Sequence, residues 1–126
     1  MKKYFVTSAL PYANGDLHLG HLVEYIQTDI WVRFNRLINN EVVYICADDA
    51  HGTPIMLKAE SEKISPEELI KKILDRHKND FDCFFIKFDN FYTTHSKENE
   101  QLATSIYRKL VNENLIEKKN DPSVFR

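Results

Sequence analysis

The stretch Glu41-Val-Val-Tyr-Ile-Cys-Ala47 decides the fold class of this chain. A continuous β-branched and aromatic run of this length is typical of a strand buried on both faces of a parallel sheet. Upstream, residues 19–38 carry apolar side chains at three-to-four spacing, which predicts a long helix that ends near residues 39–40. The β-prone residues 4–9 come before that helix and end in a loop rich in turn formers. The order strand, helix, strand predicts a βαβ unit, and hence an α/β fold with a Rossmann-like parallel sheet and flanking helices.

The predicted helices follow from apolar spacing and from the residues that open them. The long helix is expected to bury Leu22, Val23, Ile26, Ile30, Phe34, Leu37 and Ile38, with Trp31 also in the core. Thr53 followed by Pro54 predicts an N-cap and a helix to about Lys63. Ser65 with Glu68 predicts a capping box that opens another helix. Its inward residues are expected to be Leu69, Ile70, Ile73, Leu74, His77 and Phe81.

The pattern weakens in the last third of the chain. Residues 84–92 are typical of a strand or an extended segment, and Ser96 is expected to start a last helix that runs through Leu110. Leu115-Ile116 could begin another strand. Residues 118–126 have the composition of a loosened tail.

Composition sets limits on the class of protein. The 126 residues, about the modal size of one domain, carry 17 Lys and Arg against 19 Asp and Glu, so the chain has no general electrostatic attraction to nucleic acid. The longest apolar run, residues 42–47, is far too short for a membrane span, and the N-terminus lacks a signal-peptide pattern. We therefore expect a cytoplasmic protein without membrane contact. Cys46 and Cys83 lack Cys-x-x-Cys partners and are expected to be buried free thiols.

Two polar clusters follow the predicted strands. One spans residues 11–21, between the first strand and the first turn of the long helix, and the other spans residues 48–53, directly after the second strand. In a βαβ unit the carboxyl ends of the strands form the ligand crevice, with phosphate near the following helix N-terminus. The two clusters are therefore expected to meet across one crevice.

The first cluster has the residues of an anion site. His18 and His21 are three apart, so on a helical first turn they share a face and can donate N–H groups to one anion. Gly20 leaves room for a flat ring or a phosphate to approach the backbone, and the helix dipole adds partial positive charge. This arrangement suits a nucleoside triphosphate, although the chain has no P-loop and no dinucleotide glycine pattern.

The second cluster and its neighbours admit several roles. Asp49, beside His51 and Gly52, can hold the ammonium group of a small ligand, whereas Asp48 is assigned mostly to structure. Tyr12 is a candidate pocket wall, and Glu24 either faces solvent or balances the imidazoles. His77 and His95 are assigned to packing or capping. From the residues alone, His18, His21, Asp49 and His51 could instead be the metal ligands of a small hydrolase, or the chain could be a non-catalytic nucleotide-binding module.

Two motifs match a known family. Ala9-Leu-Pro-Tyr-Ala-Asn-Gly15, running into His18-Leu-Gly-His21, resembles the first signature of class I aminoacyl-tRNA synthetases in its methionyl version. Ile45-Cys-Ala-Asp-Asp-Ala-His-Gly-Thr-Pro54 resembles the second-strand motif of bacterial methionyl members. The resemblance extends to about Ile116 and implies the first half of a class I synthetase catalytic domain.

The resemblance also implies roles for individual residues. His18 and His21 would contact the ATP phosphates and stabilise charge at the α-phosphate, as catalytic residues. Asp49 would bind the methionine ammonium group. The implied reaction joins methionine to AMP, with ATP as its Mg²⁺ complex, and then passes the methionyl group to tRNA(Met). Further implied contacts are Asn14 and Gly20 to the nucleotide and Leu10 and Tyr12 to methionine, with His51, Gly52, Thr53 and Glu24 in support.

Several parts of the family pattern do not occur in this sequence. The Lys-Met-Ser-Lys-Ser signature is absent, and the resemblance implies a connective domain with a zinc site soon after Ile116. We therefore expect residues 1–126 to be the N-terminal part of a larger catalytic domain, with 117–126 as a loose tail where the connective domain would start. The implied partners are the remainder of the synthetase chain and tRNA(Met), bound mostly elsewhere. The chain by itself is expected to be poorly active, with an exposed sheet edge or partner surface.

Overall fold

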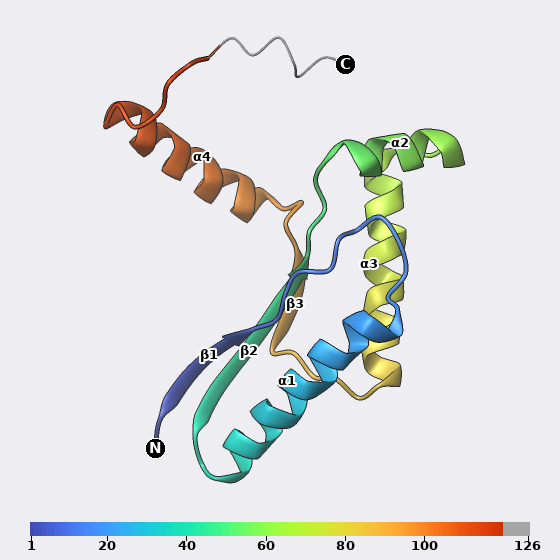
Figure 1. The fold of residues 1–126 in the computed structure, drawn as a ribbon, viewed down its shortest axis with the longest axis vertical. Helices are drawn as coiled ribbons and strands as arrows, with labels where there is room; N and C mark the ends of the chain where they lie inside the picture. The colour runs from blue at the N-terminus through green and yellow to red at the C-terminus, as the bar shows by residue number, and fades with distance from the viewer. Residues whose placement is uncertain (120–126) are drawn as a thin grey trace. The chain divides into compact units, whose positions relative to one another are not determined.

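The computed structural model describes residues 1–119. Its elements in chain order are β1 (Lys3–Thr7), α1 (Leu19–Leu37), β2 (Glu41–Asp48), α2 (Thr53–Glu62), α3 (Pro66–Cys83), β3 (Asn90–Thr93) and α4 (Lys97–Asn112) (Figure 1). The chain divides into two compact units, Met1–His95 and the residues from Ser96 onward. The first unit contains the sheet, and α4 belongs to the second.

The described strands form one parallel sheet in the order β1-β2-β3. Lys3 of β1 pairs with Glu41 of β2, and Ile45 of β2 pairs with Asn90 of β3. Helix α1 connects β1 to β2, and helices α2 and α3 connect β2 to β3. The prediction of a Rossmann-like α/β fold built on a βαβ unit is therefore confirmed.

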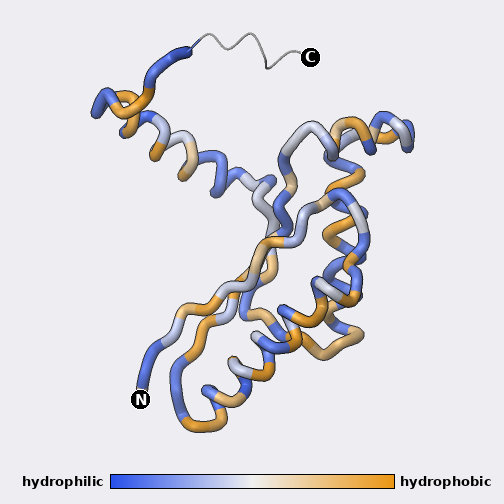
Figure 2. Tube along the Cα trace, viewed as in Figure 1, coloured by the Kyte–Doolittle hydropathy of each residue, from blue (hydrophilic) through white to orange (hydrophobic). Residues whose placement is uncertain are grey.

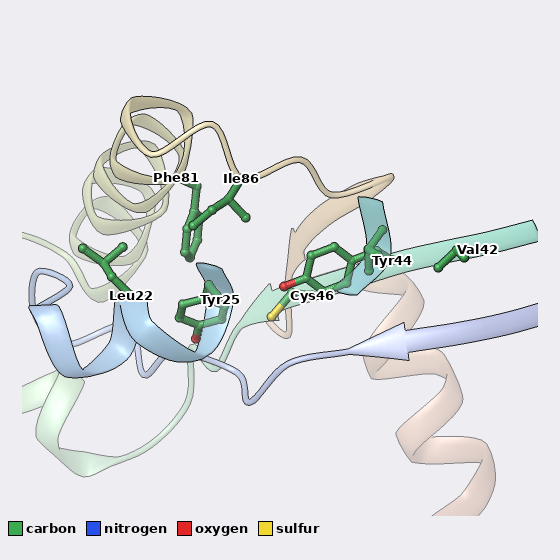
Figure 3. Packing of buried hydrophobic residues seen from close by; sticks show 8 residues of the cluster. Leu22, Tyr25, Val42, Tyr44, Cys46, Phe81 and Ile86 are labelled. Atoms are coloured by element: carbon green, nitrogen blue, oxygen red, sulfur yellow. The ribbon is translucent and has the colours of Figure 1, made fainter. Parts of the chain in front are cut away.

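One face of the sheet carries the larger of the two hydrophobic clusters. Val42, Tyr44 and Cys46 of β2 lie against buried residues of α1 and the end of α3, among them Tyr25 and Phe81 (Figure 3). The predicted burial of β2 on both faces is wrong: Val43, on the opposite face, is 40 % exposed. The reason is that α1 and α3 supply the buried cluster on one face, while β2 alternates between buried and exposed or half-buried positions.

The buried face of α1 also differs from the one predicted. Leu22 is buried as expected, but the other inward positions are Tyr25, Asp29, Val32 and Asn35. Hydrophobic residues recur along α1 (Figure 2), so the apolar pattern favoured a neighbouring face. Polar contacts explain the burial of the two polar residues on the observed face. Asp29 accepts a hydrogen bond from the Lys87 amide (2.9 Å), and Asn35 donates to the Trp31 carbonyl (3.0 Å). The predicted core residues that lie exposed are Val23, Ile30, Trp31, Phe34, Leu37 and Ile38.

The helix starts show which of the predicted N-cap residues do cap a helix. Ser65 Oγ accepts from the Glu68 amide (3.1 Å), and Ser96 Oγ accepts from the Asn99 amide (3.3 Å), so the predicted starts of α3 and α4 are confirmed. The N-cap of α2 is Gly52 instead of Thr53, and no side chain caps that end. Pro54 still occupies the first turn.

Two further predictions fail within the described residues. Leu115 and Ile116 lie in neither a strand nor a helix, so no strand begins there. Cys46 is a buried free thiol as expected, but Cys83 is exposed because it is the last residue of α3. Residues 120–126 of the predicted loose tail lie outside the described residues. No helix among residues 1–119 is long and apolar enough to cross a membrane.

Phe85 has a left-handed backbone conformation whose cost in stability can be measured. It follows α3 with φ of 57° and is 72 % exposed. A left-handed residue that is not glycine costs about 1–2 kcal/mol, and asparagine tolerates this conformation better than phenylalanine. We expect Phe85→Asn to raise the free energy of unfolding of the chain by about 0.5–1 kcal/mol in urea denaturation. An unchanged or lowered value would show that contacts of the Phe85 ring outweigh the backbone strain.

Candidate functional site

The two polar clusters lie side by side at the carboxyl end of β2. The Ala13 amide donates to the Asp49 carbonyl and the Asp49 amide donates to the Pro11 carbonyl, both at 2.8 Å. Tyr12 and Asp49 thereby form an isolated parallel bridge that continues the pairing of β1 with β2. The expected juxtaposition of residues 11–21 with residues 48–53 is present, and Asp49 itself is exposed there.

Helix α1 fixes the peptide that leads into the first cluster. Glu24 Oε1 accepts from the Ala9 amide (2.6 Å), and the Tyr25 hydroxyl donates to the Ala9 carbonyl (2.7 Å). Leu10 follows with 44 % of its surface exposed. Glu24 is therefore held in a backbone contact, whereas the sequence predicted that it would face solvent or balance the imidazoles. This contact places Leu10 and Tyr12 relative to α1.

His18 and His21 cap the start of α1 reciprocally. His18 Nδ1 accepts from the His21 amide and His21 Nδ1 accepts from the His18 amide, each at 3.3 Å. Their rings stack with centroids 3.6 Å apart and planes 16° apart. Because each Nδ1 is an acceptor, a neutral ring carries its proton on Nε2. Each ring can therefore offer one Nε2–H to an anion while it also caps the helix.

Electrostatics favour the neutral form of His21. Desolvation lowers its pKa, and the neighbouring His18 and His77 lower it further, against a smaller opposite effect of Glu24. A lowered folded-state pKa means that this ring contributes stability above its unfolded pKa of 6.5, and that the contribution is lost as the pH falls through the lower folded value. At neutral pH the ring is thus an uncharged hydrogen-bond donor.

NMR titration of the histidine rings checks that the pKa of His21 is lowered. We expect the His21 ring to titrate below pH 6.5, because burial and two nearby imidazoles oppose its protonation. The Glu24→Gln variant serves as a control and should lower the midpoint further, since Glu24 is the group that opposes the shift. A midpoint at or above 6.5 would contradict the reciprocal cap.

Gly20 and Gly52 make room for particular side chains. A Cβ at Gly20 would lie 3.0 Å from His18 Cε1, so the space beside this glycine is occupied first by the stacked His18 ring. Gly52 has φ of 125°, and a Cβ there would lie 2.8 Å from the Tyr12 hydroxyl. Tyr12 therefore rests against the start of α2, where Thr53 is the first helical residue.

His77 joins the two clusters from α3. Its Nδ1 lies 2.8 Å from Asp48 Oδ1 and its Nε2 lies 2.8 Å from the Gly15 carbonyl oxygen. Both His77 and Asp48 side chains are 1 % exposed. The sequence interpretation assigned His77 to packing or capping and gave it no role in the site; the one available signal was a polar residue in the apolar inward row of α3.

His51 lies at the opposite side of the second cluster. Its ring centroid is 5.6 Å from that of His95. Both rings line a hollow with a volume of about 480 Å³, which Gly52, Thr53 and Glu67 also line. His95 is therefore near this cluster, which the sequence interpretation did not foresee. No three His, Cys, Asp or Glu side chains among residues 1–119 are gathered as a metal site requires.

Fold and site together define a class: a Rossmann-like domain with a His-x-Gly-His turn at the first helix and a carboxylate at the end of the second strand. The sequence matches the family described as tRNA synthetases class I (M) over residues 4–126. The chain belongs to this family, as its two motifs predicted.

The curated relatives compared with this chain are methionine–tRNA ligases. The chain is 60 % identical over 119 residues to the methionine–tRNA ligase of Nitrosospira multiformis and 58 % identical over 119 residues to that of Francisella tularensis subsp. holarctica. These matches cover 94 % of this chain but only 16 % and 18 % of the relatives. The chain therefore spans less than a fifth of the length of these ligases.

Solved structures agree with the fold. Methionyl-tRNA synthetase of Mycobacterium tuberculosis, in complex with methionyl-adenylate, superposes with a TM-score of 0.86 at 29 % identity, over 90 % of this chain and 22 % of that one. The leucyl enzyme of Agrobacterium radiobacter K84, in a ternary complex with tRNA, superposes with a TM-score of 0.88 at 22 % identity, over 94 % and 15 %. The second likeness shows the shared fold alone.

Proposed function

We propose that this chain forms the ATP- and methionine-binding part of a methionine–tRNA ligase, as the N-terminal part of its catalytic domain. The observation that carries the proposal is the juxtaposition of Asp49, at the end of β2, with the loop that leads into the His18–His21 cap of α1. The identity to methionine–tRNA ligases and the neighbour that holds methionyl-adenylate support it.

The reaction needs two groups to be brought together. An oxygen of the methionine carboxylate attacks the α-phosphorus of ATP, an oxygen–phosphorus bond forms, and the bond to the β-phosphate oxygen breaks as pyrophosphate leaves with its Mg²⁺. No covalent bond to the protein is required, so catalysis is positioning together with stabilisation of developing charge.

The start of α1 supplies the charge stabilisation. Each ring of the His18–His21 pair donates Nε2–H to phosphate oxygens, while both Nδ1 atoms keep the helix start in place. The positive end of the α1 dipole acts on the same oxygens. Asn14 lies along the nucleotide, and the adenine packs at the start of α1 near Gly20, next to the His18 ring that lies beside this glycine.

The end of β2 supplies methionine recognition. The exposed Asp49 carboxylate binds the ammonium group, with the Leu10 backbone as a second contact. Tyr12, which rests against Gly52, moves over the methionine side chain, and His51 and Thr53 shape the same edge. Glu24 acts indirectly, through the Ala9 amide.

The remaining steps involve the rest of a longer ligase. We propose transfer of the methionyl group to tRNA(Met) in the cytoplasm, with tRNA bound mostly by regions outside this chain. The zinc site that the resemblance implies for the connective domain is assigned to those regions as well. The chain by itself is proposed to turn over methionine poorly.

Methionine-dependent exchange of pyrophosphate into ATP tests this function. The assay uses the chain alone and a chimeric ligase, in which the chain replaces the segment of the Nitrosospira multiformis enzyme to which it is 60 % identical. We expect exchange by the chimeric ligase and little by the chain alone. Binding of ATP or methionine without exchange in either protein would instead favour the non-catalytic module, and exchange at a synthetase rate by the chain alone would overturn the expected dependence on further residues.

A further inference from the structure

The His77 ring occupies a buried position between the two halves of the site. Its partners are both hydrogen-bond acceptors, the Asp48 carboxylate on one side and the Gly15 carbonyl on the other. A neutral imidazole has only one N–H to donate, whereas an imidazolium has two. Both ring nitrogens can therefore donate to these two oxygens when the ring is an imidazolium.

The electrostatic surroundings agree with a charged ring. Burial lowers the pKa of His77, but the hydrogen bond and charge of Asp48, the Gly15 carbonyl and the more distant Asp80 raise it, and the net shift is upward. His21 from α1 and Asp16 from the first loop also interact with the ring. Asp48 Oδ2 has no hydrogen-bond partner among the described residues, which leaves His77 as the partner that compensates this buried carboxylate.

His77 is one of three cationic contacts to consecutive residues of the loop. Lys58 Nζ donates to the Asn14 carbonyl (2.6 Å), and Arg76 Nη1 pairs with Asp16 Oδ1 (2.8 Å). The Arg76 pair is more than half exposed on both sides, so it stabilises little. The fully buried contact of His77 is the one that can fix the loop. Separating His77 from Asp48 would leave a buried charge without a partner.

The two partners of His77 stand next to the two proposed binding groups. Asp48 directly precedes Asp49, and Gly15 lies three residues before His18. We propose that His77 is a positioning residue that fixes the separation between the methionine-binding end of β2 and the phosphate-binding start of α1. This inference deepens the proposed function and rests on it for its kinetic consequence.

A first experiment does not depend on activity and uses the chain itself. Ring ¹⁵N shifts should show both His77 nitrogens protonated at neutral pH, and Asp48→Asn should lower the His77 midpoint. In His77→Gln, hydrogen exchange of the Ala13 and Asp49 amides should rise about tenfold or more. Lys72→Ala, on the exposed side of α3 in a pair with Glu68, is the matched control and should change neither reading. A neutral His77 ring with unchanged amide exchange in His77→Gln would overturn the proposal.

A second experiment measures pyrophosphate exchange by the chimeric ligase, with active sites counted by the burst of adenylate. We expect His77→Gln to lower kcat per active site by about 10²-fold, the scale of a misplacement of about 1 Å. His77→Asn, whose amide nitrogen takes the place of Nδ1, should restore part of the loss. A merely structural role lowers the number of active sites but leaves kcat per site unchanged, and that result would overturn the proposal. No exchange by the parent chimera would count against the proposed function alone, because the ring and amide measurements would still decide the role of His77.

Discussion

We expect His21→Ala to lower the rate of methionyl-adenylate formation by the chimeric ligase by about 10²–10³-fold, the usual cost of one donor to a developing charge. The expected loss lies in kcat, because the proposed role of the His21 Nε2–H is to act on the α-phosphate where charge builds up. The proposed methionine contact, Asp49, is a different group, so the KM for methionine is expected to change far less. Pyrophosphate exchange at saturating and limiting methionine separates the two effects.

His21→Asn is the matched control for the second task of this ring. His21 Nδ1 caps the His18 amide, so the alanine variant loses a cap as well as a donor. Asparagine can accept from the same amide but lacks the Nε2–H group. We expect both variants to lose activity to a similar extent and only His21→Ala to lose stability, by about 1 kcal/mol or less. An equal loss in rate and in methionine binding would count against the role of His21.

We expect Asp49→Asn to raise the KM for methionine in the same assay by about 10–10²-fold, because the ammonium group would lose a charged acceptor worth about 1.5–3 kcal/mol. The KM for ATP should stay within about twofold, since the proposed phosphate contacts are at the start of α1. Glu60→Gln, an exposed carboxylate on α2, is the control and should leave both constants unchanged. A rise in the KM for ATP, with none for methionine, would reverse the assignment of the two ligands.

The positions of β1 and β2 and the starts of α3 and α4 were predictable because they depend on local chemistry. The β-branched run of β2 and the serines that cap α3 and α4 act within a few residues of the chain. The failure at α2 is instructive, since Thr53 has the favoured cap chemistry but Gly52 takes the cap position. Gly52 does so with a positive φ, which lets the chain pass the Tyr12 hydroxyl.

The buried faces could not be predicted as well, because they depend on distant partners. Asp29 is buried in α1 since the Lys87 amide, 58 residues away, donates to it. Val43 is exposed although its sequence neighbours predict a strand covered on both faces. Hydrophobic periodicity identifies an element but does not select its buried side when apolar residues surround a helix.

The site divides in the same way. The His-x-Gly-His turn and Asp49 could be recognised from sequence, because both follow strands whose ends must meet. The contribution of His77 could not, since it comes from α3 and reaches Gly15 from 62 residues away. Likewise, the Glu24 contact with Ala9 spans 15 residues and depends on how α1 packs against the sheet.

A crystal structure of the chimeric ligase with a non-hydrolysable methionyl-adenylate analogue would show where both reacting groups bind. We predict that the group in place of the α-phosphate lies within hydrogen-bond distance of Nε2 of His18 or His21. We also predict that the amino group of the analogue contacts the Asp49 carboxylate. An analogue bound away from the start of α1, or with its amino group far from Asp49, would contradict the assignment of this site.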